Sequence, residues 1–161
     1  QNPLCSDCIQ RPDCQAFEHG WVSDLPVKQK ALVRRTRWFN YFIIRQDEQV
    51  YIQQRNGKDI WTNLFEFILY ESDGALLSDT IGLEDYVDGL IGHKGFSIKE
   101  VSKPYRQLLT HQTIIGQFIT IQLTRPPRKP ASSLLVLKDV LKTYPFPRMI
   151  NAYMQDSKTV D

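Results

Sequence analysis

Long runs of β-branched and aromatic residues restrict the possible folds of this sequence more than any other feature. One run covers residues 38–44 and is followed, after a short polar stretch, by a second at 50–53. Such a pair predicts a β-hairpin. The stretch 115–123 alternates apolar residues such as Ile119 and Ile121 with polar ones, as a half-buried strand does. The chain is therefore expected to fold around a β-sheet.

Shorter patterns add helices and further strands. Apolar residues recur at helical spacing from Leu83 to Ile91, and Gly92 or Gly95 would end that helix. The mixture of elements predicts an α+β domain. Further strands are predicted at 65–70, 98–101, 106–109 and 134–137, and short helices at 139–142 and 149–154.

Composition sets broad limits on the class of protein. The chain has 161 residues, of which 42% are hydrophobic and 24% charged, so it can bury the core of one compact domain and is neither disordered nor a coiled coil. A net charge of +2 is too small to indicate nucleic-acid binding by itself. No apolar stretch approaches the roughly 20 residues that span a bilayer, and no secretory leader is recognisable, which predicts a cytoplasmic protein.

Three regions differ in composition. Residues 1–20 form a cysteine-rich head, residues 21–37 a basic linker, and residues 38–161 the folded domain. The linker lacks a periodic apolar face, which favours an exposed connection. Its cations are Lys28, Lys30, Arg34, Arg35 and Arg37.

The head holds every cysteine of the chain. Cys5, Cys8 and Cys14 follow the pattern C-x2-C-x5-C, which is no disulfide framework but suits a soft metal ion or an iron–sulfur cluster. Three ligands are one short of a tetrahedral site. His19 would complete a zinc site, a ligand from elsewhere would complete a cluster, and free thiols are the third alternative.

The cysteine pattern resembles part of the iron–sulfur loop, C-x6-C-x2-C-x5-C, of MutY-type adenine DNA glycosylases. The residues from Asn2 to Cys8 are also similar to that family's sequence at this place. The resemblance implies a 4Fe–4S cluster held by Cys5, Cys8 and Cys14, with the first cysteine of the loop missing from this chain. We therefore expect the chain to be a C-terminal fragment.

A second resemblance lies at 55–67, where the sequence is similar to the R-x-x-x-G-x-W-x-x-x-W/F-E-F signature that follows the cluster in MutY, although Gly57 comes early. This resemblance implies a Nudix-like mixed sheet flanked by helices, preceded here by the short cysteine-rich stub. Working Nudix hydrolases carry G-x5-E-x7-R-E-U-x-E-E-x-G-U, whose glutamates bind Mg²⁺. That run is absent, so we interpret Glu84, Asp85 and Asp88 as a solvated helix face.

A third resemblance concerns the turn between the strands predicted at 106–109 and 115–123. Leu109, Thr110 and His111 look like the Phe-Ser-His turn that probes 8-oxoguanine in MutY. The family match implies that these three residues bind DNA at the lesion. Phosphate contacts were expected from one rim of cations, namely Lys94, Lys103, Arg106, Arg125, Arg128 and Lys129.

Together these resemblances predict the lesion-recognition portion of an adenine DNA glycosylase. Its partner would be double-stranded DNA with 8-oxoguanine:adenine or guanine:adenine mispairs, and it would be monomeric, use no nucleotide cofactor and work in the bacterial cytoplasm at the nucleoid. No residue of the chain is predicted to be catalytic, so the fragment alone should be inactive. The alternatives are a Nudix-type nucleotide hydrolase and a protein-interaction module that docks through the basic linker.

Overall fold

A computed structural model describes residues 3–27, 34–74, 80–127 and 133–157 of the chain. They belong to two compact units, which are residues 1–33 and 34–161. Each unit is described separately below. No helix among the described residues is long and apolar enough to cross a membrane.

The first unit holds three short helical turns, η1 (Cys5–Asp7), η2 (Arg11–Asp13) and α1 (Gln15–Glu18). None of these turns contains a buried residue. Its contacts are local, such as the Arg11 guanidinium lying 4.4 Å from the centroid of the Phe17 ring. The described part of this unit therefore lacks the apolar core that would give it independent stability.

The second unit is built on an eight-stranded mixed sheet, in which the main path runs β3-β2-β1-β7-β5. Strand β4 pairs with β1, β6 with β7 and β8 with β2. The strands are β1 (Arg35–Gln46), β2 (Gln49–Gln54), β3 (Phe65–Glu66), β4 (Ile68–Ser72), β5 (Phe96–Val101), β6 (Tyr105–Leu108), β7 (Gln112–Leu123) and β8 (Leu134–Leu137). Three helical segments accompany them, which are α2 (Thr80–Ile91), η3 (Lys138–Thr143) and α3 (Arg148–Asp156).

The centre of the sheet is the parallel pair β1 and β7. The two strands stay in register from Arg35 beside Gln112 to Arg45 beside Gln122. All other strand pairs in the described residues are antiparallel. Because both faces of a parallel pair are usually covered, these strands carry apolar residues on both sides. This explains the long uninterrupted apolar run at the start of the domain.

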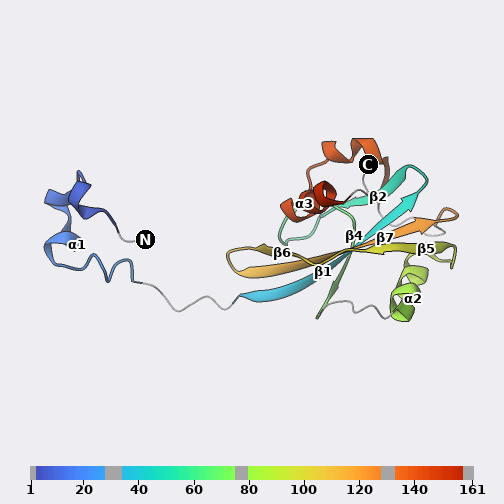
Figure 1. Cartoon of the computed structure of the whole chain (residues 1–161), viewed down its shortest axis with the longest axis horizontal. Helices are drawn as coiled ribbons and strands as arrows, with labels where there is room; N and C mark the ends of the chain where they lie inside the picture. Colours follow the sequence, from blue (N-terminus) through green and yellow to red (C-terminus); the bar gives the residue numbers. More distant parts are fainter. Residues whose placement is uncertain (1–2, 28–33, 75–79, 128–132, 158–161) are drawn as a thin grey trace. The chain divides into compact units, whose positions relative to one another are not determined.

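Helices cover the two faces of the sheet, with α3 on one side and α2 on the other (Figure 1). Beneath α3, Tyr153 stacks on Phe118 with ring centroids 4.0 Å apart, and Tyr41 stacks on Phe118 from the sheet at 5.2 Å. Beneath α2, Val87 and Ile91 pack into a second cluster of buried residues from β1 and β7. The core is therefore two layers of side chains separated by the sheet.

The predicted α+β class of fold is confirmed, and most elements lie where the sequence predicts them. The interval 65–70 is the main difference, because Phe65–Glu66 pairs with β2 and Ile68–Ser72 pairs with β1. One predicted strand is therefore two, which join different neighbours in the sheet. The segment predicted as a helix at 139–142 is a 3₁₀ helix.

The boundary of the folded domain also differs from the predicted one. The sequence predicts a linker that ends at about Arg37, whereas β1 begins at Arg35 and the compact unit at Arg34. The polar residues at the start of β1 concealed the strand, because Arg35 and Thr36 are exposed there. The predicted linker cations Lys28 and Lys30 lie outside the described residues.

Replacing either of two glycines by alanine should change the stability of the domain, in opposite directions. A Cβ atom on Gly116 would collide with the Met149 sulfur beneath α3, whereas a Cβ on Gly89 in α2 meets nothing within 4 Å. We expect Gly116→Ala to lower the free energy of unfolding by about 1–3 kcal/mol through overpacking. Gly89→Ala should raise it by about 0.5–1 kcal/mol, because alanine restricts the unfolded chain and favours helix. Urea titration of both variants checks this; equal effects would contradict the packing described.

Candidate nucleic-acid interface

The β6–β7 hairpin projects from one end of the sheet and contains all three residues predicted to read a lesion. The Leu109 amide donates a hydrogen bond to the Gln112 carbonyl oxygen at 2.8 Å, which leaves Thr110 and His111 as the tip. Both tip residues are exposed. The returning strand is β7, one of the two central strands, so the tip is held by a rigid part of the fold.

The three predicted residues do not share one environment. Leu109 is half-buried and packs against the apolar cluster beneath α3, unlike Thr110 and His111. The neighbouring Leu108 has 58% of its surface exposed. The sequence interpretation missed Leu108, although the two-residue period of a strand places it on the same face as the exposed Arg106.

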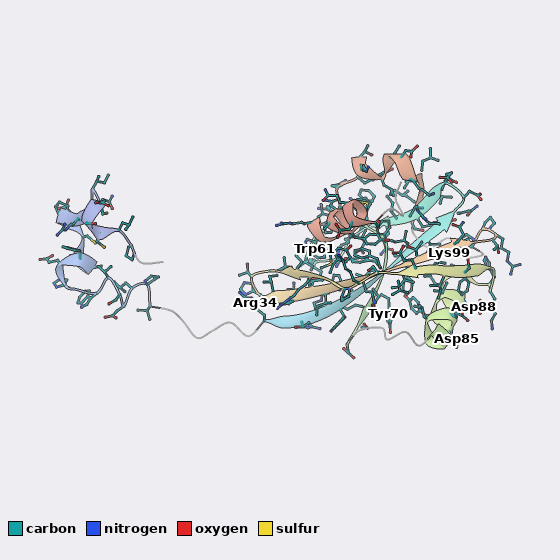
Figure 2. The ribbon with its side chains drawn as sticks, viewed as in Figure 1. Arg34, Trp61, Tyr70, Asp85, Asp88 and Lys99 are labelled. Atoms are coloured by element: carbon teal, nitrogen blue, oxygen red, sulfur yellow. The ribbon has the colours of Figure 1, made fainter. Side chains whose placement is uncertain are left out.

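Exposed arginines surround this end of the sheet. The Arg35 amide donates to the His111 carbonyl oxygen at 3.3 Å, so the start of β1 lies directly beside the tip. Arg34, Arg35 and Arg106 are all exposed. Arg34 lies at the same end of the domain as the hairpin, whereas Asp85 and Asp88 project from α2 toward the other end (Figure 2). Three exposed arginines therefore lie at this end of the sheet.

The single cationic rim expected from the sequence is not found. Arg106 lies in the hairpin, Lys103 lies beside the middle of β7, and Lys94 and Arg125 lie near its other end. A strand of twelve residues separates its ends by about 35–40 Å, so these four cations do not form one cluster. Lys103 also lies 3.7 Å from the Asp156 carboxylate. Arg128 and Lys129 lie outside the described residues.

Arg37, predicted as a free linker cation, is instead the hub of an ion-pair network. Its guanidinium donates to Asp59 at 2.8 and 2.9 Å and to Glu71 at 2.6 Å through two nitrogens. These bonds raise the pKa of Arg37, and the same hydrogen bond lowers the pKa of Asp59 to about 2. The pKa of Glu71 is lowered by its bond to Arg37 as well. Arg37 is therefore already neutralised and is not a phosphate ligand.

The segment that resembles the tryptophan signature has a structural role. Arg55 donates to the Ile60 carbonyl at 3.1 Å, to Asp59 at 3.0 Å and to the buried Glu66 at 2.6 Å, and so holds the loop against the sheet. Burial raises the pKa of Glu66, opposed by its bond to Arg55. Trp61 adopts a positive φ of 60° and meets Phe39 edge-on, with ring centroids 6.0 Å apart.

Helix α2 does not carry the R-E-U-x-E-E-x-G run of a working Nudix hydrolase. If the final glycine of that run is aligned with Gly92, the two adjacent glutamates fall at Gly89 and Leu90. The first glutamate falls at Tyr86, whose ring lies 4.6 Å from Tyr70 and 5.1 Å from Phe42 between centroids. In this alignment none of the three positions holds a carboxylate that could bind Mg²⁺.

The cysteines of the head share one environment. Cys5, Cys8 and Cys14 line one largely apolar hollow together with Leu4, Val22 and Leu25. No three His, Cys, Asp or Glu side chains in the described parts of the chain are grouped closely enough to hold a metal ion. The His19 ring stacks on Trp21 with centroids 4.5 Å apart. Binding of a 4Fe–4S cluster by the three cysteines therefore stays a prediction.

Residues 40–156 match the NUDIX domain family, and the chain therefore belongs to that family. A more specific relationship comes from an adenine DNA glycosylase of Buchnera aphidicola subsp. Schizaphis graminum. It is 33% identical to this chain over 69 residues, which are 42% of this chain and 19% of that protein. The chain thus matches about a fifth of the length of this relative.

Solved structures agree on the fold. The C-terminal domain of mouse MUTYH, in a complex with human PCNA, is similar with a TM-score of 0.61 at 11% identity, covering 75% of this chain and 86% of that domain. A MutT protein of Methanosarcina mazei Go1 gives 0.52 at 12% identity, covering 78% and 94%. The sequence match and the fold together confirm the predicted resemblance to the C-terminal region of a MutY-type glycosylase.

The ion-pair network predicts how stability depends on pH. Because the Asp59 pKa is held at about 2 in the folded chain, below its ordinary 3.8, its contribution is present above about pH 4 and is lost as pH falls toward 2. Asp59→Asn should therefore lower stability near neutral pH, by about 1 kcal/mol after allowance for solvent screening, and this difference should shrink in acid. Thermal melts over that range measure it.

Asp139→Asn is the matched control, since Asp139 is exposed and forms no salt bridge with any described residue. It should leave the melting temperature unchanged at each pH. If the difference in melting temperature between wild type and Asp59→Asn stays constant down to about pH 2, Arg37 does not hold Asp59 ionised.

Proposed function

We propose that this chain is the lesion-recognition and DNA-binding portion of an adenine DNA glycosylase that removes adenine opposite 8-oxoguanine. The observation that carries the proposal is the exposed tip Thr110–His111, held by a central strand and flanked by the exposed Arg34, Arg35 and Arg106. The resemblance to a bacterial adenine DNA glycosylase and to the MUTYH C-terminal domain supports it.

The chemistry of the lesion suits this tip. 8-Oxoguanine carries a hydrogen on N7, where guanine presents only an acceptor. The Thr110 hydroxyl oxygen would accept a hydrogen bond from this N7–H group, which guanine lacks, and so distinguish the two bases. His111 would contact a base edge or a phosphate, and the three arginines would bind phosphates without reading sequence. The chain would thus contribute discrimination and affinity, while cleavage of the glycosidic bond is not assigned to any of its residues.

Hydrolysis of free nucleotides is the rival enzymatic function. Nudix hydrolysis requires helix-borne carboxylates that bind Mg²⁺. The corresponding positions of α2 hold Gly89, Leu90 and Tyr86 instead. The preserved fold without these ligands argues for a recognition domain. Docking of a protein partner through the basic linker stays a second prediction, because residues 28–33 lie outside the described part of the chain.

The cysteine head is proposed to bind an iron–sulfur cluster when a fourth ligand draws Cys5, Cys8 and Cys14 together. Their spacing and their shared hollow support this. After anaerobic reconstitution with iron, sulfide and an added thiol as the fourth ligand, the chain should retain iron and sulfide through gel filtration, and a variant with all three cysteines changed to serine should retain none. Equal retention by both chains, or retention of zinc in place of iron, would overturn the proposal.

The proposed contact predicts that the preference for lesion-containing DNA depends on the Thr110 hydroxyl. Thr110→Val removes the hydroxyl at nearly constant shape, and should reduce the preference for 8-oxoguanine:adenine over guanine:adenine duplexes about tenfold, equivalent to one hydrogen bond of about 1–1.5 kcal/mol. Thr110→Ser should keep the preference. Titrations of fluorescent duplexes at one fixed salt concentration measure both affinities.

Two further variants separate lesion reading from simple phosphate binding. His111→Ala should weaken binding to the lesion duplex, whereas Thr124→Ala, at the other end of β7, should change nothing. Salt-sensitive and equal binding of the wild-type chain to both duplexes would leave only a nonspecific contact, and the proposed reading of the lesion would then be wrong.

A further inference from the structure

We propose that Leu108, rather than Leu109, is the apolar side chain that the hairpin inserts between base pairs beside the lesion. This inference rests on the proposed function and identifies the specificity residue within it. Leu108 is 58% exposed at the last position of β6, two residues before Thr110. A leucine so placed fills the role of the apolar wedges that unstack a base step in many DNA-bending proteins.

Register decides which of the two leucines is available. Leu108 pairs with Thr113 and Arg106 with Ile115 across the hairpin, while Gln107 pairs with the fully buried Ile114. Side chains at paired positions share a face of the sheet, so Tyr105, Gln107 and Leu109 follow the face beneath α3. Leu108 and Arg106 follow the opposite face.

The Leu109 side chain is already used in packing within the domain. It lies against the cluster beneath α3, and its amide closes the hairpin through Gln112. The Gln107 side chain accepts a hydrogen bond from the Met149 amide at the start of α3, at 3.1 Å, which fixes the same face of β6 to that helix. Insertion of Leu109 into DNA would require it to leave this contact. Leu108 needs no such rearrangement.

The charges around Leu108 match a duplex. Arg106 precedes it by two residues on the same face. Arg35 pairs with Gln112 and therefore follows the face of Leu109, although its amide bonds to the His111 carbonyl oxygen at the tip. A cation beside the leucine would bind a phosphate next to an opened base step, and so offset part of the cost of unstacking. An exposed leucine beside an exposed arginine therefore fits DNA better than it fits an apolar protein surface.

The test places 2-aminopurine next to 8-oxoguanine in a duplex, because its fluorescence rises when a neighbouring stack opens. Wild-type chain should raise the fluorescence at saturation several-fold, and Leu108→Ala should abolish the rise and weaken binding about fivefold to tenfold. Leu109→Ala should lower the melting temperature yet keep the rise. Leu134→Ala is the matched control, since Leu134 is a comparably exposed leucine (51%) on β8.

The outcomes separate this inference from the proposed function. If wild type prefers the lesion and Thr110→Val loses that preference, but Leu108→Ala keeps the fluorescence rise, the proposed function holds and Leu108 is not the wedge. If Leu109→Ala alone removes the rise while remaining folded, the assignment is reversed. If wild type shows neither a preference nor a rise, both proposals are wrong, and Leu108 is then a candidate contact for a protein.

Discussion

The parallel pairing of β1 with β7 is the interaction on which the rest of the structure depends. Every other strand joins this pair directly or through β2, and the helices α2 and α3 pack on its two faces. The two strands also carry the candidate site, because β1 begins at Arg35 and β7 follows the exposed Thr110 and His111. The candidate site thus lies where two central strands start side by side.

The elements that the sequence predicted well are those whose signal is local. An alternating strand or a helical apolar face is encoded within about ten residues, and the predictions for β7, β8, α2 and α3 agree with the structure. The adjacent Leu108 and Leu109 show the limit. Two neighbouring leucines at the end of a four-residue strand fit either phase of alternation, and only pairing with β7 decides which one is buried.

Charged residues were harder to predict because their partners are distant in sequence. Arg37 meets Asp59 and Glu71, which are 22 and 34 residues away, so nothing in its own surroundings distinguishes it from the exposed Arg35. The expected cationic rim failed for a related reason, since the length of β7 separates its members. Among the cations described, the exposed Arg34, Arg35 and Arg106 are the ones at the end of the sheet that carries the tip.

The attachment of the tip to a central strand has a consequence for how binding responds to temperature. The two exposed residues Thr110 and His111 are not carried on an independently mobile loop but on the end of β7, whose loss would be the loss of the domain. The tip should then lose little conformational entropy when it binds DNA. DNA binding and the folded sheet would then be lost in the same thermal transition, because the tip keeps its conformation for as long as the sheet is folded.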